Sequence, residues 1–259
     1  MTLIDQYPAG KFCWYELGTS ELEAGAQFYK SLFGWSSDEV PMEDGKYVLA
    51  KVQERQVAGM YKLMEEQTKM GVPPHWLLYV KVDDADASTK AAADAGATTL
   101  MGPMDVMDVG RMSVIKDPGG AVFAVWQPIK HQGSGIVGVE GTWCWSELMT
   151  RDAEACKTFY TKVFGWVANT LPMGPMQYTT FNLGDKQVGG MMEMMPEMEG
   201  IPPNWGIYWK VDNIEASTQK VRDLGGSVMC GVEEAMGVGR FSMCKDPQGA
   251  AFAMIQLNA

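Results

Sequence analysis

Hydrophobic and polar residues alternate over short stretches of the chain, and stretches with helical spacing separate them. Residues 11–17 alternate and carry aromatic side chains, which predicts a β-strand. Apolar residues then recur at the spacing of one helical face, and Gly34 ends that predicted helix. Two further strands are predicted over residues 46–52 and 55–61. The first quarter of the chain therefore reads as strand, helix and two strands.

The same order returns within the next 60 residues. A strand is predicted over 76–82, an alanine-rich helix over 86–95, and strands near 98–100, 110–115 and 121–127. Asp117-Pro118-Gly119-Gly120 has the composition of a tight turn before the last of these strands. Two consecutive β-α-β-β-(β) units are therefore expected in the first half of the chain.

The second half of the chain repeats the first. Phe12-Cys13-Trp14-Tyr15-Glu16-Leu17 returns as Trp143-Cys144-Trp145-Ser146-Glu147-Leu148. Phe28-Tyr29 and Phe33-Gly34-Trp35 return as Phe159-Tyr160 and Phe164-Gly165-Trp166. A repeat of this length indicates duplicated domains. We predict a first domain over 1–129, a glycine-rich linker over 130–140 and a second domain over 141–259.

Charge and composition narrow the possible partners. The net charge is −11 with no basic run, which argues against nucleic acids and anionic membranes as partners. The sequence contains no apolar run of about 18 residues and begins without a signal-peptide pattern. Five cysteines without Cys-x-x-Cys spacing favour reduced thiols. We expect a cytoplasmic protein, monomer or homodimer, whose partner is a small molecule.

The order of these motifs resembles the vicinal oxygen chelate superfamily. A strand, a helix carrying Phe-Tyr and ending in Phe-Gly-Trp, and a late Asp-Pro-x-Gly turn occur in both halves, over about 10–129 and 141–258. That superfamily includes glyoxalase I, bleomycin-resistance proteins and extradiol dioxygenases. The resemblance implies an α+β fold, with two glyoxalase-like domains in tandem. Each domain would pair two βαβββ modules into a cup-shaped mixed sheet.

The sequence leaves the pairing of the four modules open. A cup could form inside each domain, or the first module could pair with the fourth and the second with the third.

In metal-bearing members of the superfamily, four strand positions supply histidine or glutamate ligands to one divalent ion. Counting from the Phe-Tyr and Asp-Pro motifs places these positions on residues without metal-binding side chains: Trp14, Gly59, Leu77 and Ala124, and Trp145, Gly190, Gly206 and Ala253. A register error of one residue would turn every side chain to the other face of the sheet. We therefore predict that the chain uses no metal and no other cofactor.

The period of two along a strand predicts what the cups contain. If Trp14 points into a cup, Glu16 does too, and the same holds for Trp145 and Glu147. The other strands add apolar and aromatic residues, which we predict to contact a ligand: Tyr61, Tyr79 and Trp126 in the first domain, and Met192, Tyr208 and Ile255 in the second. A flat organic molecule would suit such a lining. The differences between copies predict unequal cups.

Glu16 and Glu147 are the candidates for catalytic acid–base groups. A carboxylate among aromatic rings is expected to have a raised pKa, which suits proton transfer. The competing interpretation is that each glutamate pairs with an arginine, Arg111 or Arg240, and only orders the barrel. Those arginines are also candidate ligand contacts. Two further matched pairs, Tyr47 with Tyr178 and Trp76 with Trp205, are interpreted mainly as packing residues.

Three hypotheses of function follow. The favoured one is a metal-free, glyoxalase-like protein that binds a small hydrophobic or aromatic molecule in a cup. The second is a cofactor-independent enzyme, such as a lyase, isomerase or hydroxylase-like protein, that uses Glu16 or Glu147 to move a proton. In the third, the cups are filled by their own side chains and the protein has a structural role. Metal-dependent glyoxalase or dioxygenase chemistry is the remaining alternative that the resemblance offers.

Overall fold

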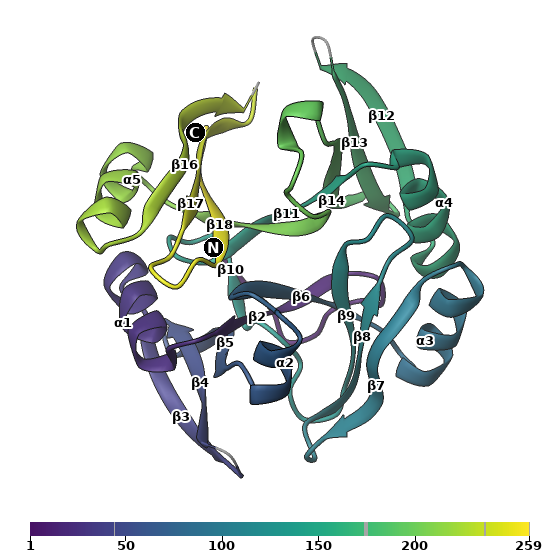
Figure 1. Ribbon diagram of the computed structural model, residues 1–259, viewed down its shortest axis with the longest axis horizontal. Coiled ribbons are helices and arrows are strands. Elements are labelled where there is room, and N and C mark those ends of the chain that lie inside the picture. The colour runs from purple at the N-terminus through teal and green to yellow at the C-terminus, as the bar shows by residue number, and fades with distance from the viewer. Residues whose placement is uncertain (44, 174–175, 236, 259) are drawn as a thin grey trace.

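The computed structural model describes residues 1–43, 45–173, 176–235 and 237–258. Two eight-stranded mixed sheets dominate it, one from each half of the chain (Figure 1). The first half contains β2 (Phe12–Thr19), α1 (Leu22–Phe33), β3 (Ser36–Met42), β4 (Gly45–Val52), β5 (Arg55–Lys62), α2 (Glu65–Lys69), β6 (His75–Lys81), α3 (Ala85–Asp94), β7 (Thr98–Val106), β8 (Gly110–Lys116) and β9 (Val122–Pro128).

The second half repeats this order. It contains β11 (Trp143–Thr150), α4 (Ala153–Phe164), β12 (Val167–Met173), β13 (Met176–Leu183), β14 (Lys186–Glu193), the 3-10 helix η1 (Pro196–Met198), β15 (Asn204–Lys210), α5 (Ile214–Asp223), β16 (Ser227–Ala235), β17 (Gly239–Lys245) and β18 (Ala251–Leu257). A two-stranded ribbon joins β1 (Thr2–Leu3) to β10 (Ile136–Val137).

Each sheet is assembled from two βαβββ modules that meet at their first strands. The strand order of the first sheet is β3-β4-β5-β2-β6-β9-β8-β7, with β2 parallel to β5 and antiparallel to β6. The second sheet has the equivalent order. The prediction of an α+β fold with two tandem copies, each pairing two βαβββ modules into a mixed sheet, is therefore confirmed. Both sheets pair modules from the same half of the chain, which answers the question that the sequence left open.

The sequence pattern missed the edge strands β3 and β12 and the short helix α2, as well as the two-residue strands β1 and β10 and the 3-10 helix η1. β3 and β12 lie at the sheet edges, and almost all of their residues are exposed or only partly buried. An edge strand with both faces in solvent has no apolar alternation to reveal it. α2 has five residues, none of them buried, so a helical apolar face is absent there as well. β3 and β12 complete the βαβββ pattern of the first and third modules, and α2 lies between the first and second modules.

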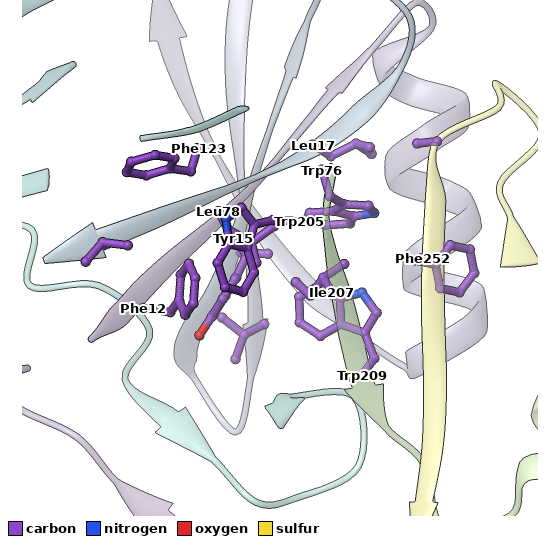
Figure 2. Packing of buried hydrophobic residues seen from close by; sticks show 14 of the residues in the cluster. Phe12, Tyr15, Leu17, Trp76, Leu78, Phe123, Trp205, Ile207, Trp209 and Phe252 are labelled. Atoms are coloured by element: carbon purple, nitrogen blue, oxygen red, sulfur yellow. The ribbon is translucent and has the colours of Figure 1, made fainter. Parts of the chain in front are cut away.

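The backs of the two sheets share one hydrophobic core. Tyr15 of β2 stacks on Trp143 of β11, with ring centroids 5.4 Å apart, and also contacts Trp209 of β15. Figure 2 shows residues from both halves gathered in this core, including Phe12 and Trp205, whose ring centroids lie 4.9 Å apart. Because strand side chains alternate, burying Tyr15 at the back turns Glu16 to the opposite face.

The Phe-Tyr and Asp-Pro motifs meet across the two halves of the chain. The Tyr29 hydroxyl of α1 donates to Asp246 Oδ2 at 3.1 Å, and the Tyr160 hydroxyl of α4 donates to Asp117 Oδ2 at 2.7 Å. Trp76 Nε1 donates to the Tyr29 oxygen at 2.9 Å. Helix α1 accordingly lies beside α5, and α3 beside α4 (Figure 1). The first module thus contacts the fourth through its helix, while its sheet pairs with the second.

Trp76 and Trp205 are core residues, as predicted, and are 6 % and 4 % exposed. The five cysteines are free thiols. None of the helices that the structure describes has the length and apolar character needed to cross a membrane.

Candidate functional site

A carboxylate held by two tyrosines lies on the concave face of the first sheet. Glu16 of β2 accepts a hydrogen bond from Tyr47 of β4 at 2.7 Å and one from Tyr79 of β6 at 2.6 Å. The two tyrosines use different carboxylate oxygens, Oε1 and Oε2. Trp14 Nε1 in turn donates to the Tyr47 hydroxyl oxygen at 3.1 Å. Four residues from three strands therefore form one network.

The second sheet contains the same network. Glu147 of β11 accepts hydrogen bonds from Tyr178 of β13 at 2.8 Å and from Tyr208 of β15 at 2.9 Å. Trp145 Nε1 donates to the Tyr178 hydroxyl oxygen at 3.0 Å. The predicted site residues Trp145, Glu147 and Tyr208 are thus brought together, as are Trp14, Glu16 and Tyr79 in the first copy.

Glycines on the neighbouring strand make room for one tyrosine of each network. A Cβ at Gly59 would lie 1.8 Å from the Tyr47 hydroxyl oxygen, and a Cβ at Gly190 would lie 1.9 Å from that of Tyr178. The tyrosine ends therefore occupy the space that a side chain at 59 or 190 would need. Gly59 and Gly190 are also the positions that correspond to a metal ligand in the resembled superfamily.

Burial controls the ionisation of both networks. It raises the pKa of Glu16, and hydrogen bonds from Tyr79 and Tyr47 oppose part of that rise. Burial likewise raises the pKa of Glu147 against the hydrogen bonds from Tyr178 and Tyr208. The pKa values of Tyr47, Tyr79 and Tyr208 lie well above their usual value because their rings are buried beside a carboxylate. The tyrosine hydroxyls consequently remain protonated and act as donors.

The interpretation that arginines pair with these glutamates is wrong. Arg111 Nε lies 2.6 Å from Asp86 Oδ2, and its Nη1 lies 2.9 Å from Asp105 Oδ1. Arg240 pairs with Glu215. Tyrosine side chains reach the buried carboxylates, whereas surface acids near the sheet edges attract the arginines. Ligand contacts by Arg111 or Arg240 stay a prediction.

Residues of the chain itself fill the first cup near Trp14. The rings of His131 and Trp14 are in edge-to-face contact, with centroids 4.3 Å apart. Trp126 Nε1 donates to the His131 carbonyl at 2.9 Å, and Ser134 N donates to the Cys13 carbonyl at 2.8 Å. Trp14 and Trp126 are consequently only 4 % and 5 % exposed. The segment 129–135 therefore seals this part of the cup.

The helix α2 and the side chain of Leu77 also reduce the space in the first cup. Tyr61 accepts a hydrogen bond from Gln67 of α2 at 3.1 Å, which places this short helix beside the cup. Leu77 contributes a buried side chain next to Glu16, its partner across the strands.

The second cup lacks these fillings. Position 206, which corresponds to Leu77, is a glycine, and a Cβ there would meet only the Glu147 carbonyl oxygen within 4 Å, at 3.6 Å. Trp145, Met192 and Glu147 are all partly exposed. Ile255 replaces Trp126, and η1 replaces α2. The two cups thus differ: the second has no side chain at position 206 and leaves Trp145 partly exposed, whereas Leu77 and Trp14 are buried in the first and the two glutamates are partly exposed alike.

The residues at the inferred ligand positions do not fit a metal ion. Tryptophan, glycine, leucine and alanine stand at these eight positions, and none of their side chains binds a divalent ion. Glu16 and Glu147 offer one carboxylate to each cup. Within the residues that the structure describes, no three His, Cys, Asp or Glu side chains come together in a metal-binding group.

Two hollows lie outside the cups. One of about 150 Å³ is lined by the start of α4 and by β13 and β14, including Arg151 and Glu193. The other, of about 530 Å³, lies between α3 and α4 and is lined by Asp94 and Lys162 among others. Neither is lined by Glu16 or Glu147.

Two contributors to the site were missed from sequence. Tyr47 and Tyr178 were interpreted mainly as packing residues, yet they donate to the glutamates. Their recurrence together with Gly59 and Gly190 is the signal that could have revealed them. His131 lies in the predicted linker, where no residue pattern indicates that its ring fills a cup.

Comparison with known proteins agrees with this architecture. The model of the Glyoxalase/Bleomycin resistance protein/Dioxygenase superfamily matches residues 11–125 and 144–254. "Putative glyoxylase CFP32" of Mycobacterium tuberculosis is 36% identical over 254 residues, covering 97% of this chain and 96% of that protein. The anthracycline biosynthesis protein DnrV of Streptomyces peucetius is 32% identical over 265 residues, covering 98% and 95%.

Solved structures share the fold at low sequence identity. The 2,3-dioxygenase LapB from Pseudomonas sp. KL28 superposes with a TM-score of 0.66 at 16% identity, over 96% of this chain and 92% of that one. The Mn(II)-bound glyoxalase from Novosphingobium aromaticivorans gives a TM-score of 0.65 at 14% identity, over 96% and 82%. With the family match over both halves, these findings lead to one conclusion: the chain belongs to the Glyoxalase/Bleomycin resistance protein/Dioxygenase superfamily.

Proposed function

We propose that the second cup binds a small organic molecule with a flat aromatic part, without a metal ion, and that the chain acts as a binding protein. The observation that carries this proposal is the free space over Gly206, beside the partly exposed Trp145 and Glu147. A concave apolar surface with one polar anchor is the usual form of a small-molecule site. The first cup is filled by its own chain and takes no part.

The kinship with DnrV supports the aromatic character of the ligand. That relative is named for anthracycline biosynthesis, and anthracyclines are planar polycyclic aromatic compounds. In this chain, the rings of Trp145, Tyr208 and Phe241 supply the surface on which a flat molecule would stack. Met192 and Met243 are flexible and polarisable, so they can adapt to the outline of the ligand.

The test is a calorimetric titration with a neutral aromatic probe, 1-naphthalenemethanol. We expect saturable binding of one molecule per chain. Gly206→Leu places in the second cup the side chain that the first cup already contains, and binding should fall at least tenfold. Gly231→Leu is the matched control, because a Cβ at this exposed edge position meets nothing within 4 Å. No binding to the wild type, or equal binding by the two variants, would overturn the proposal.

A second function, acid–base catalysis without a cofactor, is favoured by the environment of Glu147. Its pKa is raised by burial, and the carboxylate lies beside the free space of the cup. A carbonyl compound with a flat ring, 2-acetylnaphthalene, tests this possibility in D₂O. Exchange of its methyl protons, followed by NMR, should be accelerated by the wild type and not by Glu147→Gln. Equal exchange rates with both proteins would leave binding as the only function of the cup.

A further inference from the structure

We infer that the ligand of the second cup carries a protonated amine, which sits against Glu147 beside Tyr178 and Tyr208. This inference rests on the proposed function, since it names the chemical class that the same cup would take. It follows from the hydrogen-bonding capacity left in the cup, from the charge of its surroundings and from the tyrosine oxygens beside the carboxylate.

Every N–H or O–H group that contacts Glu147, or a tyrosine bound to it, already donates a hydrogen bond within the network. Trp145 Nε1–H is donated to Tyr178, and the Tyr178 and Tyr208 hydroxyl protons are donated to the two oxygens of Glu147. The thiol of Cys144 donates to the Tyr208 carbonyl. What remains is a set of acceptors, namely the other lone pairs of the carboxylate and of the tyrosine oxygens. A ligand that satisfies them must bring donors, and an ammonium group brings three.

No cationic side chain of the described part of the chain neutralises Glu147. Every ion pair found within 4.0 Å in that part involves other acids, including that of Arg240 with Glu215. Its partners are two tyrosine hydroxyls and no cation, so its charge is not neutralised and an incoming positive charge gains more here than beside an acid that already has an ion-pair partner. The chain as a whole carries a net charge of −11, which also attracts cations from a distance.

The tyrosine oxygens favour the same charge. Tyr178 and Tyr208 point their hydroxyl ends at the carboxylate, so two further electron-rich oxygens lie beside an ammonium group held there. An anionic ligand would meet both the carboxylate and these oxygens unfavourably. The absence of a side chain at Gly206 leaves room for a ligand beside the partly exposed Glu147, whereas the buried Leu77 takes up the equivalent room beside Glu16.

The experiment compares three naphthalene probes that share one ring and differ in charge: 1-naphthylmethylammonium, 1-naphthalenemethanol and 1-naphthoate. Each is titrated into the full chain by calorimetry near pH 8. We expect the ammonium to bind at least tenfold more tightly than the alcohol, and the carboxylate to bind more weakly than both. In Glu147→Gln the affinity for the ammonium should fall by at least ten times the factor by which the affinity for the alcohol falls, so that the advantage of the ammonium disappears.

Glu193→Gln is the matched control for the loss of one negative charge. Glu193 is exposed on β14, next to Met192 along the strand, and faces away from the cup. The ammonium advantage should remain in this variant. If the alcohol binds and the ammonium binds no better, the inference fails while the proposed function stands. If none of the three probes binds, both fail. An ammonium advantage that persists in Glu147→Gln would also overturn the inference, because another group would then recognise the charge.

Discussion

The hydroxyl of Tyr178 lies in the space that a Cβ of Gly190 would occupy, so one strand's lack of a side chain lets a tyrosine of the next strand reach Glu147. The same relationship joins Tyr47 to Gly59. Counting from the sequence motifs assigns a metal ligand of the superfamily to positions 59 and 190. In this chain a glycine stands at each position, and the neighbouring tyrosine donates a hydrogen bond to the glutamate.

Gly190→Ala tests this relationship. The added Cβ would stand 1.9 Å from the Tyr178 oxygen, so the end of the tyrosine must swing away from Glu147. We expect the variant to fold, to lose about 1–3 kcal/mol of stability from the broken buried hydrogen bond, and to bind 1-naphthylmethylammonium at least tenfold more weakly. Denaturant unfolding and calorimetry measure the two effects.

Gly59→Ala is the matched control for that variant. Its Cβ meets the Tyr47 oxygen at 1.8 Å in the filled first cup, so its stability should fall by a similar amount while ligand affinity stays unchanged. An equal loss of affinity in both variants would show that the effect spreads through the fold and does not arise at the second cup.

Amine binding should weaken in acid at a higher pH than an ordinary glutamate would predict. Burial raises the pKa of Glu147 above its usual value of 4.5, so on acidification the carboxylate becomes neutral early and loses its attraction for a cation. Binding should therefore also release protons near that pKa. Calorimetric titration of 1-naphthylmethylammonium from about pH 8 to pH 5, in two buffers of different ionisation enthalpy, checks both effects. An affinity that is constant over this range would contradict the expectation.

His131 should make the fold sensitive to acid. Burial lowers its pKa from 6.5 to about 4, so between these values the unfolded chain binds a proton that the folded chain does not. The stabilising contribution of the neutral ring is complete above pH 6.5 and is lost as the pH falls toward 4. His131→Phe keeps a ring against Trp14 and removes the titration.

Comparing the wild type with His131→Phe separates the titration of His131 from that of Glu16 and Glu147, which are present in both proteins. We expect the free energy of unfolding to fall less steeply between pH 6.5 and 4 in His131→Phe than in the wild type. Urea unfolding at several pH values gives both slopes. Identical slopes would mean that the His131 ring is protonated equally in the folded and unfolded chains.

The contacts between the two halves should be important for stability. The Tyr160 hydroxyl donates to the buried Asp117 and accepts from Trp205 Nε1 at 2.7 Å. Tyr160→Phe leaves Trp205 Nε1 without its acceptor and removes one donor from Asp117, which keeps the hydrogen bond from Ala121 N, and we expect a loss of about 1–3 kcal/mol in denaturant unfolding. Tyr29→Phe breaks the equivalent contacts with Asp246 and Trp76 and should cost a similar amount. Wild-type stability in both variants would contradict this role of the Phe-Tyr motif.

The sequence by itself determined the repeat, the order of elements and the identity of most of the network. The pattern of period two predicted that Trp14 and Glu16 lie on the same face of the sheet, because every second side chain of a strand points the same way. The motifs that recur in both halves predicted the fold. The side chains at the eight inferred ligand positions cannot bind a divalent ion, so they predicted a protein without a metal.

Tertiary structure decided what the strand pattern does not encode. Which donor reaches Glu16 of β2 depends on residues of other strands, Tyr47 of β4 two strands away and Tyr79 of the adjacent β6, so tyrosines hold it and Arg111 does not. The filling of the first cup depends on the path of the linker, which puts His131 on Trp14. The tryptophan of the network is therefore buried in the first half, as Trp14, and partly exposed in the second, as Trp145, since long-range packing sets solvent access and local sequence does not.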